Sequence, residues 1–61
     1  MTGKGLKELR KRLGVTQREL ATRAALHWNT IAKMERDEVP ITKSRAILFR
    51  LLEQTARKRG R

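Results

Sequence analysis

Cysteine and tyrosine are missing from this 61-residue chain, and proline, tryptophan, phenylalanine and histidine each occur once. Without cysteine the chain can form neither a disulfide nor a thiolate metal site, so apolar packing must stabilise it, with oligomerisation as the other source. No apolar run approaches the roughly 20 residues of a membrane span, and residues 1–5 lack the apolar stretch of a secretory signal. We therefore expect a soluble, intracellular protein.

The groups that most enzymes need are missing as well. The chain has a single histidine, no glycine-rich phosphate loop and no pair of carboxylates on a common helical face. A chain of this length forms one domain with a small core, which leaves little room for a catalytic cleft. We expect no enzymatic activity, no cofactor and no bound metal ion.

Positive charge is what the chain has in excess. Sixteen Lys and Arg residues stand against six Asp and Glu residues, for a formal net charge of +10. This bias indicates a polyanionic partner. Nucleic acid fits best, because binding it displaces the counterions condensed on the phosphates. An anionic membrane surface, an acidic protein or a merely solvated basic surface stays open on charge alone.

The pattern of apolar residues predicts an all-α fold. Strand signals are weak, whereas apolar residues recur at helical spacing in four segments, separated by breaks at 14–15, 24–27 and 37–41. We predict a compact domain of four helices over residues 1–56 and a basic tail at 57–61. The tail is either a disordered arm that adds non-specific affinity or a frayed helix end.

The ends of the first two helices are signalled locally. The first runs over about 4–13 and is ended by Gly14, since glycine adopts the left-handed conformation common past a helix end. Thr16 and Glu19 form a T-x-x-E capping box that begins the second helix.

The third helix is predicted over about 28–36, with an apolar side and a polar, basic side. Pro40 then breaks the chain, and Thr42 can cap a fourth, longer helix from about 43 to 57. On the outer side of the third helix, at 100° per residue, lie Asn29, Lys33 and Arg36, with Ala32 at the edge and Trp28 on the flank.

The fourth helix is apolar over roughly 200° of its circumference, about twice the stripe that faces one core. Part of this surface needs a second partner. A homodimer is the simplest one, because a two-fold contact lets one apolar patch cover its own copy. The alternative is that the helix is enclosed by its own core. The residues expected at the dimer interface are Leu48, Phe49, Leu51 and Leu52.

Two charged residues lie within apolar stripes, Arg10 on the first helix and Glu35 on the third. Each would be costly to bury alone, so the opposite charges are predicted to meet in a partly buried, bidentate ion pair. The alternative is that both extend into solvent.

The stretch G-V-T-Q-R-E-L-A at 14–21, followed by T-I-A-K-M-E at 30–35, resembles the lambda repressor and Cro type of helix-turn-helix domain, often called the XRE family. The similar region extends from Leu6 to Leu52. The resemblance implies that the second and third helices form the helix-turn-helix unit and that the third lies in the DNA major groove.

The resemblance also implies roles for individual residues. Gln17 matches a residue that contacts a phosphate and braces the reading helix, and Arg10 and Glu35 match residues that pair in some members. The base-reading candidates are Trp28, Asn29, Ala32 and Lys33. The candidates for DNA backbone contacts are Thr16, Gln17, Arg18, His27, Arg36, Lys43 and Arg45.

Trp28 has two placements open, either against DNA or packed on the protein beside Leu26 or Gln17. The chain departs from the family pattern at Ala25, where a turn glycine is usual, and at His27, where a Ser or Thr cap is usual. The predicted single long fourth helix also differs from the two shorter helices of many members.

The resemblance implies a transcriptional regulator, a repressor or autorepressor that binds an inverted repeat in double-stranded DNA as a homodimer. The alternatives are an antitoxin-type DNA-binding protein with a protein partner, and a non-specific nucleic-acid binder, although the chain lacks the aromatic platforms of single-strand binders. No membrane partner or small-molecule ligand is expected. The expected location is the prokaryotic cytoplasm at the nucleoid, or the host cytoplasm if a phage encodes the protein.

Overall fold

The structure is a computed structural model that describes residues 1–59, with side chains described to residue 56. Four helices make it up, and the described residues contain no strand, so the predicted all-α class is confirmed. The helices are α1 (Gly3–Leu13), α2 (Gln17–Arg23), α3 (Trp28–Glu35) and α4 (Lys43–Arg59). α4 includes the backbone of the first three residues of the predicted tail, and residues 60–61 lie outside the described part.

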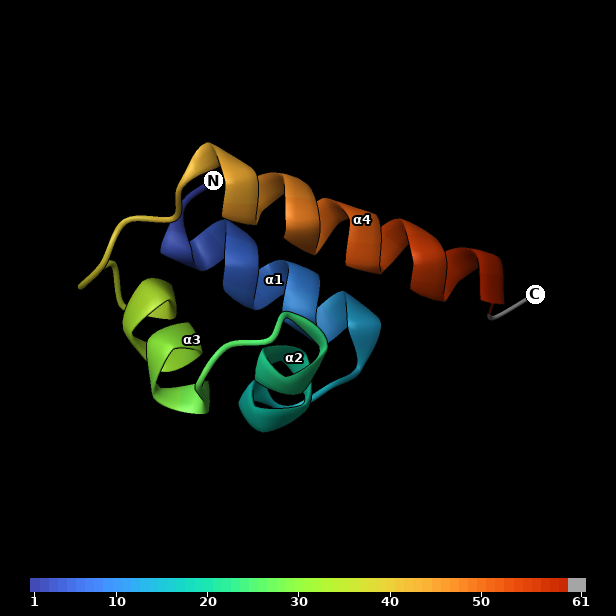
Figure 1. The fold of residues 1–61 in the computed structure, drawn as a ribbon, viewed down its shortest axis with the longest axis horizontal. Helices are drawn as coiled ribbons and strands as arrows, with labels where there is room; N and C mark the ends of the chain where they lie inside the picture. The colour runs from blue at the N-terminus through green and yellow to red at the C-terminus, as the bar shows by residue number, and fades with distance from the viewer. Residues whose placement is uncertain (60–61) are drawn as a thin grey trace.

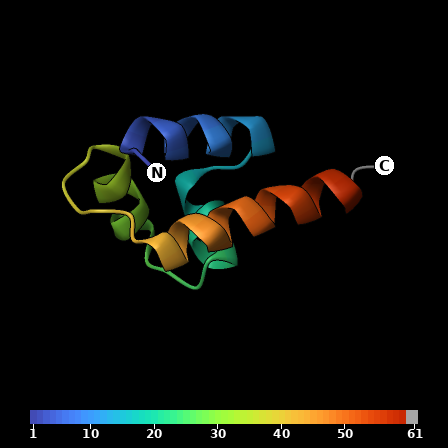
Figure 2. The same cartoon turned by 90° about the horizontal axis from the view of Figure 1, so that it is seen from above.

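α1 contacts both α3 and α4, and the shorter α2 and α3 pack on each other (Figure 1). Figure 2 shows α1 and α4 on two sides of the molecule, and in both views the C-terminal turns of α4 extend beyond the other helices. The molecule measures 35 × 20 × 19 Å, with α4 along its long dimension. None of the described helices is long and apolar enough to cross a membrane.

The helix ends follow the local chemistry of the sequence. The Thr2 side chain caps α1 by accepting a hydrogen bond from the Gly5 amide at 3.0 Å. At the start of α2, the Glu19 amide donates to Thr16 Oγ1 at 3.1 Å and the Thr16 amide donates to Glu19 Oε1 at 2.9 Å. The predicted capping box is therefore formed. Gly14 ends α1 in the left-handed region, with φ 71°.

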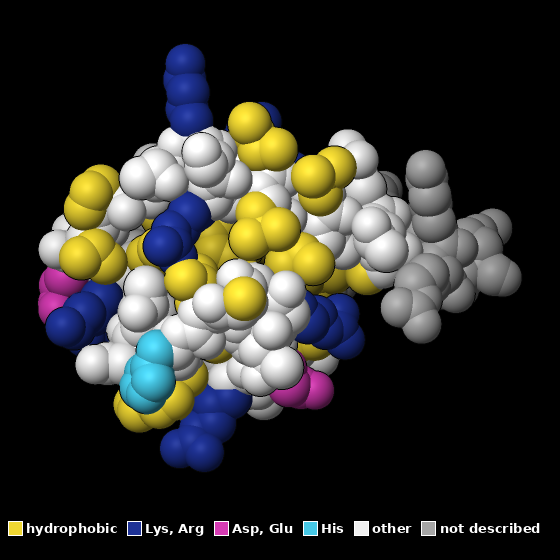
Figure 3. All heavy atoms as spheres, in the orientation of Figure 1, with side chains coloured by type: hydrophobic (Ala, Val, Ile, Leu, Met, Phe, Trp, Pro, Cys, Tyr) yellow, Lys and Arg dark blue, Asp and Glu magenta, His cyan; other side chains and the backbone are white. Residues whose placement is uncertain are grey.

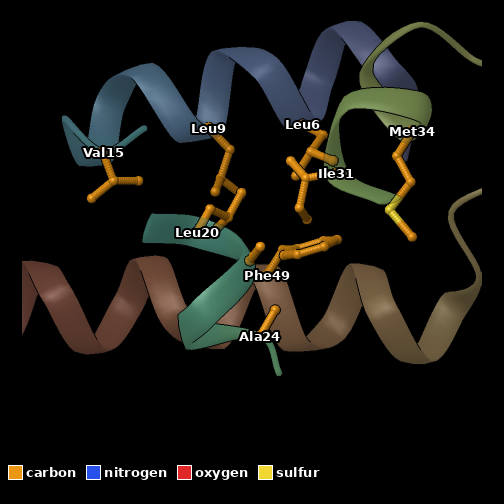
Figure 4. Packing of buried hydrophobic residues seen from close by; sticks show 9 residues of the cluster. Leu6, Leu9, Val15, Leu20, Ala24, Ile31, Met34 and Phe49 are labelled. Carbon is orange, nitrogen blue, oxygen red and sulfur yellow. The ribbon is translucent and has the colours of Figure 1, made fainter. Parts of the chain in front are cut away.

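All four helices contribute to one apolar core, shown in Figure 4. Its largest fully buried side chains are Phe49, Leu6, Leu9, Leu20 and Ile31. Small residues on α2 let the neighbouring helices approach, since Ala21 and Ala24 are also buried. A core of this size needs every helix, because a short chain buries a limited fraction of its surface.

The apolar surface of α4 divides into an inner and an outer part. Phe49 has no exposed surface and belongs to the core, so its expected place in a dimer interface is wrong. Leu48 and Leu52 are partly buried against the same core. On the opposite side, Ile47 and Leu51 are 57% and 52% exposed. Figure 3 shows hydrophobic side chains gathered along α4 on the visible face.

The N-terminus of α1 packs directly on the C-terminal end of α3. The Gly3 amide donates to Asp37 Oδ1 at 2.9 Å. A Cβ atom at position 3 would lie 2.6 Å from the Glu35 carbonyl oxygen and 2.8 Å from Asp37 Oδ1, closer than real contacts allow. Only glycine fits this approach. A second link ties α1 to α4, where Arg12 Nε donates to Glu53 Oε2 at 2.7 Å.

Candidate DNA-binding surface

Arg10 and Glu35 lie together and connect α1 to α3. Arg10 Nε donates to Glu35 Oε2 at 2.7 Å, and Arg10 Nη2 donates to Oε1 at 3.3 Å. Only 4% of the Glu35 side chain and 16% of the Arg10 side chain are exposed. Arg10 Nη1 also donates to the Val15 carbonyl oxygen at 3.2 Å. The pair therefore fixes α3 against both α1 and the entry to α2.

Gln17 brings the first turn of α2 into the same cluster. Its Nε2 donates to Glu35 Oε1 at 3.1 Å, and its side chain is half-buried. Glu35 thus accepts hydrogen bonds from two helices, which satisfies a carboxylate that would be costly to bury alone. The hydrogen bond from Gln17 sets the position of α3 relative to α2. This is what the bracing role implied for Gln17 requires.

α3 turns a polar face outward, as its periodicity predicts. Asn29 and Lys33 are exposed on this face, and 41% of Trp28 is exposed at its N-terminal end. Ala32 is only 4% exposed, which leaves its methyl group little surface for the base contact predicted for it. Asn and Lys carry the amide and ammonium groups that pair with base edges in a major groove.

His27 caps α3 with its ring. Its Nδ1 accepts a hydrogen bond from the Asn29 amide at 3.1 Å, so a ring nitrogen takes the place of the usual hydroxyl. The preceding turn places Ala25 at φ 57°, in the left-handed region that favours glycine. Both departures from the family pattern therefore keep the geometry of the turn and of the cap.

Trp28 contacts Arg18 and His27. The sequence pointed to Leu26 or Gln17 as packing partners of this ring and did not indicate Arg18. The Arg18 guanidinium carbon lies 5.5 Å from the centroid of the Trp28 ring. The His27 and Trp28 ring centroids are 5.8 Å apart, with the planes tilted by 30°. The sequence carries no local signal for the first contact, because the two residues belong to different helices.

The remaining candidates for backbone contacts are spread over the turn and the start of α4. Thr16, Arg18 and Lys43 are exposed, whereas Arg45 is half-buried. The exposed Arg36 donates from Nε to Glu38 Oε2 at 2.5 Å, and this hydrogen bond raises the pKa of Arg36. A phosphate at Arg36 would therefore compete with a carboxylate that is already present.

No group of three or more His, Cys, Asp or Glu side chains that could hold a metal occurs among the described residues. Structural residues that the sequence reasoning missed are Gly3 and Asp37 at the α1–α3 contact and the pair of Arg12 and Glu53. Each depends on a long-range approach between helices, for which the local sequence carries no signal.

Comparison with protein families identifies the family to which this chain belongs. The helix-turn-helix family model matches residues 6–51, from the first core leucine of α1 to the outer face of α4. No curated protein and no solved structure matches the chain. Because the matched region covers most of the chain and includes α2, the turn and α3, the protein belongs to the Cro and lambda-repressor (XRE) type of helix-turn-helix family, which consists of DNA-binding, non-enzymatic domains.

Proposed function

We propose that this DNA-binding protein is a repressor or autorepressor that recognises an inverted-repeat operator as a homodimer. Each protomer lays α3 in the major groove, and Asn29 and Lys33 read the bases. Transcription is blocked sterically, because a dimer on the operator occupies the DNA that a polymerase needs. The two half-site centres lie about one helical turn apart, ~34 Å, on one face of the duplex.

The observation that carries this proposal is that α3 has an exposed polar face, while its opposite side is hydrogen-bonded to α1 and α2. Asn29 and Lys33 point away from the core, while Glu35 on the other side of α3 is bound by Arg10 and Gln17. Side chains that discriminate bases must be held in a defined geometry, because bidentate pairing tolerates little displacement. The excess of positive charge supports the phosphate contacts.

Dimerisation through the outer face of α4 supports the inverted repeat. Ile47 and Leu51 are one helical turn apart and more than half exposed, which leaves an apolar strip on the surface. Leu48 and Leu52 border this strip. A second copy covers it most simply, since a two-fold axis places the same strip on both partners.

Selection of bound sequences from a random duplex library tests the proposal, at about 150 mM salt so that non-specific phosphate binding is suppressed. We expect an enriched inverted repeat. An enriched single half-site would remove the homodimer, and binding without any enriched motif would remove sequence-specific regulation and leave a general nucleic-acid binder.

Single substitutions on α3 identify the readers. Asn29→Ala and Lys33→Ala should each weaken binding to the selected site by roughly 1–3 kcal/mol per lost base contact and leave the helix content unchanged. Lys7→Ala is the matched control, because it removes one exposed charge from α1. Fluorescence anisotropy with the selected duplex measures the effect. If both α3 variants keep the base preference of the parent protein, α3 is not the element that reads the bases.

A further inference from the structure

Gln17 and Arg18 are neighbours at the start of α2, and their side chains reach opposite ends of α3. Gln17 donates to Glu35, the last residue of α3. Arg18 lies over the ring of Trp28, the first residue of α3. The first turn of α2 therefore holds both ends of the helix that faces DNA.

We propose that Trp28 is a positioning residue that holds the Arg18 guanidinium for a DNA phosphate, and that Trp28 reads no base. The inference rests on the proposed function only in that DNA must lie against α3. It assigns different roles to two residues that are both exposed beside the reading face.

The cation–π contact between Arg18 and Trp28 favours this division of roles. A guanidinium placed over an aromatic ring is attracted through its face, while its N–H donors at the edge stay available for a phosphate. Among the described residues, Arg18 forms no ion pair with a carboxylate, unlike Arg10, Arg12 and Arg36. The ring thus restrains a long, flexible cation without neutralising its charge.

Trp28 is poorly suited to discriminate bases itself. Its one polar group is a single N–H donor, whereas Asn29 can both donate and accept at one base edge. The Arg18 guanidinium lies over the Trp28 ring, and the centroids of the His27 and Trp28 rings are 5.8 Å apart. His27 is held in turn by the hydrogen bond that its Nδ1 accepts from the Asn29 amide. The indole therefore already contacts a cation and a second ring of the protein itself.

The free protein offers a direct test, because Trp28 is the only tryptophan in the chain. Arg18→Ala should change the intensity and wavelength of the tryptophan emission, and Arg23→Ala should leave both unchanged. Arg23 is a matched control, since it is an exposed arginine on the same helix. Identical emission in Arg18→Ala and the parent protein would show that the contact between Arg18 and Trp28 is not formed in solution, and the proposal would fail.

The second test measures binding to the selected duplex as a function of salt. Arg18→Ala should lower the slope of log affinity against log salt by about 0.9 per protomer, the value for one phosphate contact. Trp28→Leu should lower the slope in the same direction, the double variant should lose no more than Arg18→Ala alone, and Trp28→Phe should restore part of the loss. The sequence selected by Trp28→Leu should match that of the parent.

Three outcomes would overturn the proposal: a slope unchanged by Trp28→Leu, losses that add in the double variant, or a changed base preference at one position. These outcomes differ from failure of the proposed function. If no sequence is enriched by the parent protein, the same salt series on a random duplex still measures the phosphate contact of Arg18 and its dependence on Trp28.

Discussion

Glu35 accepts hydrogen bonds from both Arg10 and Gln17, and only 4% of its side chain is exposed. Arg10→Ala would leave this carboxylate with an amide donor alone. We expect a loss of about 3 kcal/mol in the free energy of unfolding, because a buried charge loses its partner. Urea denaturation followed by circular dichroism measures it. Arg23→Ala, at an exposed position on α2, should stay within about 0.5 kcal/mol of the parent.

A similar loss in both arginine variants would mean that net charge, and not the buried pair, controls stability. A negligible loss in Arg10→Ala would mean that Glu35 reaches solvent when its partner is removed.

Gly3 has a role that a matched pair of glycine variants can separate from helix propensity. Gly3→Ala should destabilise the protein by about 1–3 kcal/mol, because its Cβ would lie within 2.6 Å of the Glu35 carbonyl oxygen. Gly5→Ala is the control, since its Cβ would lie 3.3 Å from Thr2 Oγ1 and 3.6 Å from Met1 Cγ, both on side chains. Alanine favours a helix over glycine, so Gly5→Ala should be neutral or stabilising. Thermal denaturation compares them, and equal changes in both variants would contradict the close approach of α1 to α3.

At the scale of single residues, the sequence predicted a contact where a residue breaks the pattern of its helix face. A charge inside an apolar stripe, as at Arg10 and Glu35, points to a partner of opposite sign. Gly3 carried no such signal, because the requirement for glycine comes from the backbone of another helix. The burial of Ala32 was not predictable either, because a methyl group at the edge of a helix face can be either covered or exposed, and tertiary packing decides which.

The capping box of α2 links an element to pH. The Thr16 amide donates to the Glu19 carboxylate, and this hydrogen bond holds the pKa of Glu19 below its ordinary value. A pKa lowered by folding contributes stability above the unfolded value, and that contribution is lost as the pH falls through the folded value. We therefore expect the melting temperature to decrease below about pH 4.5, the ordinary value for a glutamate.

Glu19→Gln separates this contribution from the rest. Its amide oxygen can still accept from Thr16 but does not titrate, so the melting temperature of the variant should fall less steeply with acid. Part of the dependence should persist, because a hydrogen bond from Arg36 also lowers the pKa of Glu38. Calorimetry between pH 6 and pH 3 gives the comparison (a range that brackets ordinary carboxylate values of about 4). If the melting temperature falls equally steeply with acid in both proteins, titration of the capping box does not contribute to the pH dependence.

Helix ends were predictable because the residues that cap them lie within three or four positions of each other. The α2–α3 turn was less so. Ala25 adopts φ 57° where glycine is favoured, and His27 caps α3 with a ring nitrogen, so the tertiary contacts of the two helices impose the turn on residues that do not specify it. The contact of Arg18 with Trp28 follows from that turn and was likewise beyond local reasoning.

At the scale of the whole molecule, periodicity predicted four helices and one core but not how α4 is rotated about its axis. A helix that is apolar over more than one face does not indicate which face its own core covers. The structure buries Phe49 and leaves Ile47 and Leu51 outside. The contacts of Phe49 with core side chains from the other helices decide this rotation, and they depend on the whole fold.

This rotation determines which substitutions test dimerisation cleanly. Leu48 and Leu52 pack against the core, so a charge at either position would disturb the fold as well as any interface. Ile47→Glu and Leu51→Glu instead place a charge on the exposed strip, where the isolated protomer tolerates it. Thr22→Glu introduces the same charge at an exposed position on α2, away from the strip, and serves as the control.

Sedimentation equilibrium should show the parent protein and Thr22→Glu as dimers and both strip variants as monomers, with helix content unchanged in all four. The monomers should bind the full inverted repeat with lower affinity, because each half-site contact must then form without the second tethered to it. Their base preference within a half-site should persist, since α3 is not altered. If Ile47→Glu and Leu51→Glu remain dimeric, the two-fold contact lies on another surface. If the parent itself is a monomer that still selects an inverted repeat, the dimer assembles only on DNA.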